Sequence, residues 1–239
     1  MSTKPLGGKA YGHISHLPGS RLGPGDHHCH EGQARIATLK ARDRHDLVIV
    51  QEKVDGSCCA VAKLDGCILP LTRAGYLATT SKLEQHVLFF GWVMEREPLF
   101  QELLAEGERI VGEWLAQAHG TRYALPHEPF VAFDIFRNGK RVLYAELTDR
   151  LTGHLPLAQL LHTGGPLGVE LALARIDRTV HGAIDEPEGA VWRVERQGQV
   201  DFLTKYVRPD KADGCYLPEL NGGEAVWNWR SSASRTAPT

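Results

Sequence analysis

The stretch Glu52-Lys53-Val54-Asp55-Gly56-Ser57 closes an apolar run that begins at Asp46. The run reads DLVIVQ and is rich in β-branched residues, so it predicts a strand that ends at this stretch. Alternation along the strand places Lys53 and Asp55 on the same face, and Gly56 allows a tight turn to follow. An amine held beside apolar walls loses solvation, which lowers its pKa and is one route to a nucleophilic lysine. An exposed lysine before a turn is the competing interpretation.

The sequence on either side of this stretch predicts an antiparallel α+β fold. Turn signals at Asp65-Gly66 and Asn138-Gly139 separate β-rich runs, and helical spacing over 81–105 includes a break expected near Pro98. Residues 1–32 are rich in Gly, Pro and His and predict surface loops. Three strands are predicted within 46–73, then strands at 109–116, 130–136 and 141–145, helical or mixed structure over 147–176, and a hairpin of 190–196 and 199–207.

Composition narrows the class of protein. The 239 residues are 42% hydrophobic and carry a formal net charge of −2, which suits one large or two small globular domains and excludes a bulk nucleic-acid coat. No apolar run approaches the roughly 18 residues that span a bilayer, and the N-terminus lacks the apolar core of a signal peptide. A cytoplasmic protein is therefore predicted. Neither a GxxxxGK(S/T) phosphate loop nor a GxGxxG fingerprint is present.

The cysteine and histidine patterns weigh against a disulfide or zinc framework. The five cysteines include no CxxC pair, so they are expected to be reduced thiols. The run Asp26-His27-His28-Cys29-His30-Glu31 has the composition of a transition-metal site, but adjacent ligands without a second pair match known zinc spacings poorly. A solvated polar loop is the preferred interpretation of this cluster, and its role is left open.

Six short motifs follow one another in the order that characterises a known superfamily. Lys53-Val54-Asp55-Gly56 resembles motif I of the covalent nucleotidyltransferases, which comprise RNA ligases, DNA ligases and capping enzymes. The resemblance runs from about residue 46 to 210 and implies an antiparallel-sheet core with a nucleotide pocket between the sheets. It continues with Thr72-Arg73-Ala74-Gly75 (the arginine motif), Val111-Gly112-Glu113-Trp114 (motif III), Phe130-Val131-Ala132-Phe133-Asp134-Ile135 (motif IIIa), Glu188-Gly189-Ala190-Val191-Trp192-Arg193 (motif IV) and Leu203-Thr204-Lys205-Tyr206-Val207-Arg208 (motif V).

The resemblance implies chemical roles for three charged residues. Lys53 would attack the α-phosphate of ATP, expel pyrophosphate and hold AMP as a phosphoramidate. Glu188 would help to place a divalent ion, Mg²⁺ or Mn²⁺, and Lys205 would contact the α-phosphate as negative charge shifts to the leaving group. The competing interpretations are a solvated carboxylate for Glu188 and an exposed strand lysine for Lys205.

Four further residues would hold the nucleotide by the same resemblance. Glu113 would accept hydrogen bonds from the ribose hydroxyls, and Phe133 would stack on the adenine ring. Glu52 lies on the opposite strand face from Lys53, yet its backbone would border the base. Arg73 would bind the ribose or the 5′-phosphate of the acceptor strand. A half-buried carboxylate, a core phenylalanine and a surface arginine are the competing interpretations of Glu113, Phe133 and Arg73.

Motif V departs from the family pattern of two lysines separated by one residue. Val207 occupies the position of the second lysine, and Arg208 follows one residue later. A shift of one residue on a strand turns a side chain to the opposite face. Whether Arg208 replaces the second lysine is therefore left open, as is the register of Lys205.

The compact set of motifs is most similar to the ATP-dependent RNA ligases of the RNA ligase 2-like family. The resemblance implies an enzyme that adenylates an RNA 5′-phosphate and seals it to a 3′-hydroxyl, with no membrane involved. A DNA-nick or other polynucleotide adenylyltransferase on the same core is one alternative. A non-catalytic module that binds nucleotides or nucleic acids is the other.

Three regions are expected along the chain. Residues 1–45 are expected to form a loop-rich extension, 46–210 the nucleotidyltransferase core, and 211–239 a C-terminal extension whose last residues, 230–239, are a mobile tail. Only 31 residues follow Arg208, fewer than the roughly 50 of a small independent domain. No C-terminal oligonucleotide-binding domain is therefore expected.

Overall fold

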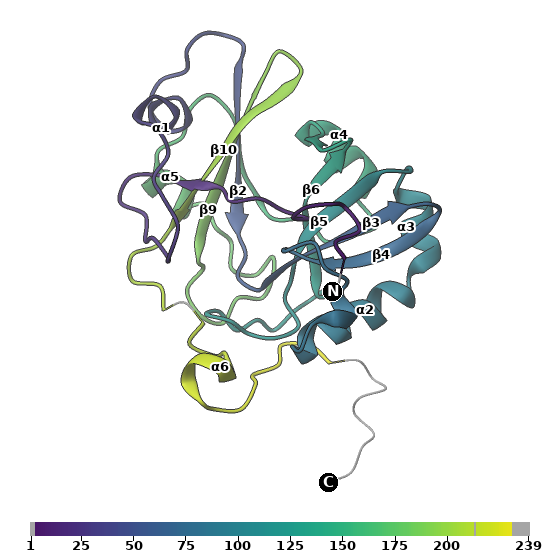
Figure 1. Ribbon diagram of the computed structural model, residues 1–239. Helices are drawn as coiled ribbons and strands as arrows, with labels where there is room; N and C mark the ends of the chain where they lie inside the picture. Colours follow the sequence, from purple (N-terminus) through teal and green to yellow (C-terminus); the bar gives the residue numbers. More distant parts are fainter. Residues whose placement is uncertain (1–2, 213, 231–239) are drawn as a thin grey trace.

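Two five-stranded sheets lie side by side in residues 3–212 and 214–230, which the computed structural model describes (Figure 1). The first sheet has the strand order β1-β10-β9-β2-β8, and the second has the order β4-β3-β5-β6-β7. All neighbouring strands are antiparallel except β1 and β10, which are parallel. The first sheet contains β1 (Ser15–His16), β2 (Asp46–Lys53), β8 (Leu160–Gly164), β9 (Gly189–Arg196) and β10 (Gln199–Val207). The second contains β3 (Ser57–Leu64), β4 (Cys67–Thr72), β5 (Glu108–Trp114), β6 (Phe130–Arg137) and β7 (Lys140–Arg141).

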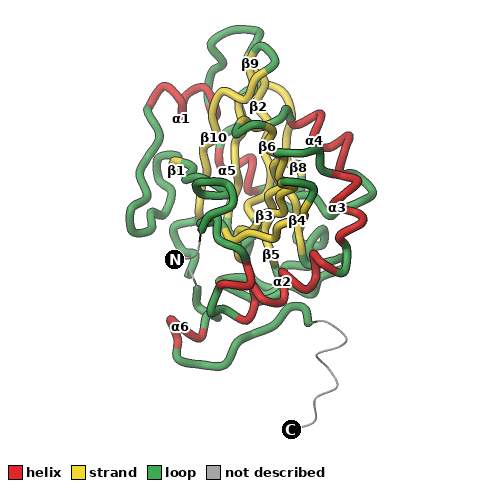
Figure 2. The backbone as a smooth tube through the Cα atoms, turned by 45° about the vertical axis from the view of Figure 1, so that its right-hand side comes forward, coloured by secondary structure: helices red, strands yellow, loops and turns green. Residues whose placement is uncertain are grey.

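The helices lie on the outside of the strands (Figure 2). Buried alanines of α1 (Glu31–Thr38) and α5 (Val169–Leu173) pack against the first sheet. The second sheet is covered by α2 (Glu84–Met94), α3 (Glu97–Leu103) and α4 (Tyr144–Leu151). A short 3₁₀ helix, η1 (Ala78–Thr80), precedes α2, and α6 (Pro218–Asn221) belongs to the C-terminal segment.

A cluster of aromatic side chains holds α2 against the second sheet. Phe89 and Trp92 on α2 pack against Trp114 on β5 and Phe130 on β6, and the ring centroids across this contact are 5.3–5.7 Å apart. All four rings are buried. Their tilted and edge-on arrangements add favourable quadrupole contacts to the burial of apolar area.

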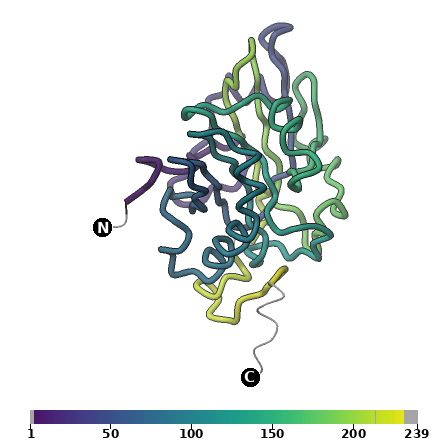
Figure 3. Tube along the Cα trace, turned by 90° about the vertical axis from the view of Figure 1, so that its right-hand side faces the viewer, coloured from purple at the N-terminus to yellow at the C-terminus, as the bar shows by residue number. Residues whose placement is uncertain are grey.

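The C-terminal segment 214–230 passes below the strands (Figure 3). The ring of Trp229 lies 5.7 Å from that of Trp114, and the amide of Ala118 donates a hydrogen bond of 2.8 Å to the carbonyl of Val226. The segment therefore covers one end of the aromatic cluster.

Strand pairing brings distant parts of the chain to one end of the first sheet. Strand β9 lies between β2 and β10, so it pairs with both. Lys53 at the end of β2 lies opposite Gly189 at the start of β9, and Lys205 on β10 lies opposite Val191. Because Glu188 directly precedes Gly189, the register places it next to Lys53.

The crossing from the first sheet to the second requires a glycine. Gly56 lies between β2 and β3, where the chain passes from one sheet to the other. A Cβ atom at this position would lie 2.5 Å from the carbonyl oxygen of Trp114, which is closer than real Cβ contacts. The missing side chain of Gly56 therefore lets the turn pack directly on β5.

Most strands predicted from the sequence are confirmed, and one predicted strand is wrong over most of its length. The three strands within 46–73 and the final hairpin form as predicted. The strand predicted at 141–145 ends at Arg141, because Leu147 and Leu151 bury one face of a helix that begins at Tyr144. The helix break predicted near Pro98 is confirmed at 95–96, and Pro98 itself lies in the first turn of α3, where a missing amide costs little.

Regular structure also appears where the sequence did not predict it. The loops predicted for 1–32 contain the short strand β1, and α1 begins at Glu31. The mixed region 147–176 includes the edge strand β8, whose sequence LLHTG shows no clear alternation. The predicted mobile tail falls outside the described residues except for Arg230, whose guanidinium lies 4.4 Å from the ring of Trp227. None of the helices in the described part of the chain is both long and apolar enough to cross a bilayer.

We expect Phe89→Ala to lower the free energy of unfolding by about 3–5 kcal/mol, because it leaves a cavity among buried rings. Equilibrium unfolding in urea measures the change. Leu171→Ala is the matched control, since Leu171 is 60% exposed on α5, and its unfolding free energy should change by less than about 0.5 kcal/mol. Equal losses in the two variants would show that the aromatic cluster does not stabilise the fold.

Candidate active site

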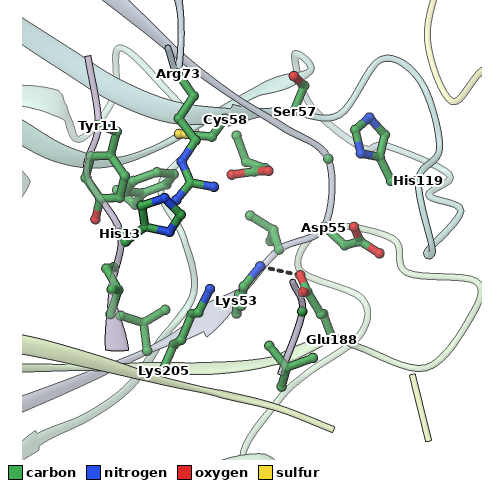
Figure 4. A pocket seen from close by; sticks show the side chains of 18 of the residues that line it. Tyr11, His13, Lys53, Asp55, Ser57, Cys58, Arg73, His119, Glu188 and Lys205 are labelled. Carbon is green, nitrogen blue, oxygen red and sulfur yellow. Dashed lines mark hydrogen bonds and ion pairs between the residues drawn. The ribbon is translucent and has the colours of Figure 1, made fainter. Parts of the chain in front are cut away.

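A cavity of about 900 Å³ lies between the two sheets, next to the crossing from β2 to β3 (Figure 4). Its wall combines residues of both sheets with residues of the N-terminal segment. All seven residues predicted for the site border this one cavity: Glu52, Lys53, Arg73, Glu113, Phe133, Glu188 and Lys205.

The ammonium of Lys53 forms an ion pair with Glu188. Its Nζ lies 2.5 Å from Glu188 Oε2, and the two side chains are 22% and 12% exposed (Figure 4). Burial acts to lower the pKa of Lys53, but the charges of Glu188, Glu113 and Asp55 outweigh it and raise that pKa above its ordinary value. The lowered pKa expected from the sequence is therefore wrong, because carboxylates rather than apolar walls surround the amine.

Two carboxyl groups of the cavity titrate close to neutral pH. Burial raises the pKa of Glu113 to about 8 and that of Glu188 to about 7, although the charge of Lys53 opposes both increases. Repulsion from the other carboxylates of the cavity adds to each increase. These groups titrate as a coupled set and can accept either protons or a cation.

Asp55 fixes the turn that follows Lys53. Its Oδ2 accepts hydrogen bonds from the Gly120 amide at 3.0 Å and from the Thr121 hydroxyl at 3.2 Å. The Nζ of Lys211 lies 3.4 Å from the same oxygen, and the Asp55 amide donates to the hydroxyl of Tyr123 at 3.0 Å. Asp55 thus joins this turn to the loop after β5.

Phe133 and Arg73 both meet the N-terminal segment. Phe133 on β6 is half-buried, and the ring of Tyr11 lies edge-on to it with centroids 5.3 Å apart. Arg73 follows β4, is exposed, and donates from Nη2 to the carbonyl of Gly12 at 3.3 Å. Sequence analysis missed Tyr11, since no local pattern connects it with Phe133.

The carboxylate of Glu52 lies away from Lys53, as alternation along β2 predicts. Its Oε2 is 3.9 Å from Nε2 of His181, a residue that does not border the cavity. Burial, with a smaller contribution from the charge of Asp177, raises the pKa of Glu52 to about 7. Any contribution of Glu52 to ligand binding therefore falls to its backbone.

The end of β10 resolves the question raised by motif V. Lys205 borders the cavity, whereas Arg208 does not and pairs instead with Glu186 at 2.8 Å and Asp210 at 3.0 Å. Arg208 therefore does not enter the position of the second lysine. Lys211, which lies beyond the strand pattern and was missed from the sequence, does border the cavity.

The histidine-rich run near residue 28 lies at the surface. His27, His28 and His30 are exposed, and Cys29 is half-buried. Across residues 3–212 and 214–230, no three or more His, Cys, Asp or Glu side chains gather in an arrangement that could hold a metal ion. The exposure of the three histidines agrees with a solvated polar loop, whereas Asp26, the first residue of the run, is only 19% exposed and lies 3.0 Å from the buried His16.

Comparison with known protein families identifies the family of the chain. Residues 46–207, more than half of the sequence, match the family model for RNA ligases. The chain belongs to the RNA ligase family. The matched region runs from β2 to β10 and includes all seven predicted site residues, whereas the N-terminal segment lies outside it. A comparison with curated protein sequences finds no match.

The solved structures of Naegleria gruberi RNA ligase share this fold at low sequence identity. Naegleria gruberi RNA ligase with PPi is 16% identical, with a TM-score of 0.54 over 87% of this chain and 62% of that one. A lysine mutant of the same enzyme, with ATP and Mn, is 15% identical with a TM-score of 0.54 over 81% and 59%. An archaeal ATP-dependent RNA ligase is 21% identical with a TM-score of 0.47 over 68% and 42%. This RNA ligase family member therefore spans between 42% and 62% of the lengths of these proteins.

We expect Glu188→Gln to lower the pKa of Lys53, because it removes the carboxylate in direct contact with the ammonium. Without that negative charge the ammonium is less stable, so its half-titration moves to lower pH. NMR titration of protein containing ¹³C-labelled lysine, with the Lys53 signal assigned from Lys53→Ala, measures the shift. Glu186→Gln changes an exposed carboxylate two residues away and should leave the pKa of Lys53 unchanged. An unchanged or higher pKa in Glu188→Gln contradicts the prediction.

Proposed function

We propose that this RNA ligase family member is an ATP-dependent RNA ligase that forms a lysyl-AMP intermediate on Lys53. One observation carries the proposal: Lys53, Lys205 and Arg73 reach a single cavity from three separate elements, and Glu188 lies 2.5 Å from the amine (Figure 4). Such a cavity offers positive charge to phosphates and carboxylates to a cation. The motif order and the family match support the same activity.

The first half-reaction would transfer a nucleotidyl group. The unprotonated Nζ of Lys53 forms a bond to the α-phosphorus of ATP, and the bond from that phosphorus to the bridging oxygen breaks. Pyrophosphate leaves with the electron pair. The nitrogen, positively charged once the new bond forms, passes one proton to water and becomes the phosphoramidate nitrogen. Because the ion pair with Glu188 raises the pKa of Lys53, this contact must open before the amine can attack. Lys205 would stabilise the negative charge that develops on the phosphate.

The chemistry of the carboxylates fits a hard divalent cation. Mg²⁺ binds one or two protein carboxylates and completes its coordination with water and substrate phosphates. The carboxylates of Glu113 and Glu188 both border the cavity and are ligands of the kind that such an ion prefers. Glu188 would hold Mg²⁺ or Mn²⁺, and the ion would neutralise charge on the phosphates. The solved Naegleria structure contains ATP and Mn.

The remaining predicted residues would hold the nucleotide and the acceptor. Glu113 would accept from the ribose hydroxyls, the half-buried ring of Phe133 would stack on adenine, and the backbone of Glu52 would border the base. Arg73, exposed at the cavity, would bind the ribose or the acceptor 5′-phosphate.

The later steps would take place on RNA. AMP would move from Lys53 to an RNA 5′-phosphate, and a 3′-hydroxyl would then attack that phosphate and release AMP. We infer that the substrate is RNA with 5′-phosphate and 3′-hydroxyl ends and that the enzyme acts in the cytoplasm. Residues 46–210 would form the catalytic core, with 1–45 and 211–239 as extensions of it.

We expect the purified protein, mixed with α-labelled ATP and Mg²⁺ or Mn²⁺, to retain label after denaturation. Lys53→Ala removes the nucleophile and should retain none. Asp201→Asn is the matched control, since it changes an exposed carboxylate that pairs with Arg42, and it should be labelled like the wild type. Wild-type protein that is folded, freed of pre-bound AMP and still unlabelled with either metal would exclude the lysyl-AMP mechanism.

We also expect RNA ends to be sealed at least about tenfold faster than matched DNA ends, because a 2′-hydroxyl is the group by which a protein distinguishes the two. Gel assays on nicked duplexes and single strands that differ only in their sugars measure the ratio. Equal rates would favour a general polynucleotide ligase. Nucleotide binding without label on Lys53 or transfer to either end would favour the non-catalytic binding module.

A further inference from the structure

Part of the N-terminal segment borders the cavity although it lies outside the family-matched region. We call residues 10–26 the strap. Its short strand β1 pairs in parallel with β10, and His16 lies opposite Lys205. The amide of Leu17 donates to the carbonyl of Lys205 at 2.8 Å. The strap is therefore fixed along the strand that carries Lys205.

The strap brings one carboxylate to Lys205. The Oδ2 of Asp26 lies 3.9 Å from Lys205 Nζ, and the two side chains are 19% and 14% exposed. Within the described part of the chain this is the one ion pair of Lys205, whose ammonium donates no hydrogen bond there. A distance of 3.9 Å is too long for a hydrogen bond. Asp26 can thus fix the direction of the ammonium while its three N–H donors remain available to an anion.

Asp26 is itself held in place by a chain of contacts that returns to β10. Its Oδ2 accepts from the amide of Gly23 at 3.2 Å and lies 3.0 Å from Nε2 of the buried His16. The Nδ1 of His16 lies 2.7 Å from Oγ of Ser20, and that oxygen accepts from the amide of Val207 at 2.9 Å. Val207 lies two residues after Lys205 on β10. These contacts therefore fix the position of Asp26 relative to the strand that carries Lys205.

The charge of Asp26 also offsets the repulsion that Lys205 meets in the cavity. Burial lowers the pKa of Lys205, and the charges of Lys53 and Arg73 lower it further. Asp26 and Glu188 act in the opposite direction and favour the ammonium. Asp26 is the carboxylate that approaches Lys205 from the strap, whereas Glu188 is engaged with Lys53.

We propose that Asp26 is a positioning residue that holds the Lys205 ammonium toward the α-phosphate site. The inference rests on the proposed role of Lys205 in adenylation. It makes the strap part of the catalytic unit, although the RNA ligase family match begins only at residue 46.

Asp26→Asn tests the proposal. The amide has the size of the carboxylate and keeps an oxygen that can accept from the Gly23 amide, but it carries no charge. We expect the rate constant of Lys53 adenylation in a single turnover to fall at least about tenfold, with the KM for ATP changing less than about threefold. Asp201→Asn, which changes an exposed carboxylate on the strand that carries Lys205, should match the wild type in both. A rate in Asp26→Asn within twofold of the wild type overturns the proposal. Thermal unfolding checks that each variant is folded, and Asp26→Ser replaces Asp26→Asn if that variant unfolds.

A second measurement needs no turnover. In protein with ¹³C-labelled lysine, the NMR signal of Lys205, assigned from Lys205→Arg, should move in Asp26→Asn and stay in place in Asp201→Asn. A Lys205 signal that does not move shows that Asp26 does not orient the ammonium and overturns the proposal. Absence of label on the wild type would instead reject the proposed ligase activity, and the Lys205 signal would still decide whether Asp26 orients Lys205.

Discussion

Burying the ammonium of Lys53 between two sheets costs solvation free energy, and the charged groups of the cavity are arranged to offset that cost. Glu188 lies 2.5 Å from the amine, and Glu113 and Asp55 add negative charge around it. Burial, with a smaller contribution from neighbouring carboxylates, raises the pKa of Glu113 to about 8 and that of Glu188 to about 7. The charged side chains of the cavity therefore pair with one another. A ligand that separates them must supply an anionic partner for the ammonium and a cationic partner for the carboxylates.

The ion pair between Lys53 and Glu188 depends on the register of β2 against β9. A slip of one residue between β2 and β9 would turn Lys53 to the opposite face and separate it from Glu188. The register is held by the apolar core of the first sheet: Trp192 on β9 lies opposite Val50, is fully buried, and donates from its indole to the carbonyl of Leu167 at 2.8 Å. The hydrophobic core of the first sheet thus sets the geometry of the charged site.

Local patterns predicted the parts of the molecule that local forces determine. Alternation and turn residues predicted β2, β3, β4 and the final hairpin, and the order of the motifs placed seven residues in one cavity. The pKa of Lys53 could not be predicted, because its sign depends on carboxylates that are distant in sequence. Tyr11, Asp26 and Lys211 were missed for the same reason, since each reaches the cavity only through tertiary contacts of segments without a periodic pattern.

The two lysines proposed for adenylation differ in how tightly they are held. Lys53 is in close contact with Glu188, so its amine is unavailable until that contact opens. Lys205 has a looser ion pair, 3.9 Å from Asp26, and leaves its donors directed to no protein acceptor among the described residues. Under the proposed function, a phosphate would therefore bind Lys205 first. Its oxygens would compete with Glu188 for the Lys53 ammonium, and the positive charges of Lys205 and of a cation drawn to Glu188 would lower the pKa of Lys53 toward the free amine. In this order of events, nucleotide binding itself frees the Lys53 amine. When no phosphate is bound, the ion pair with Glu188 keeps that amine protonated and unreactive.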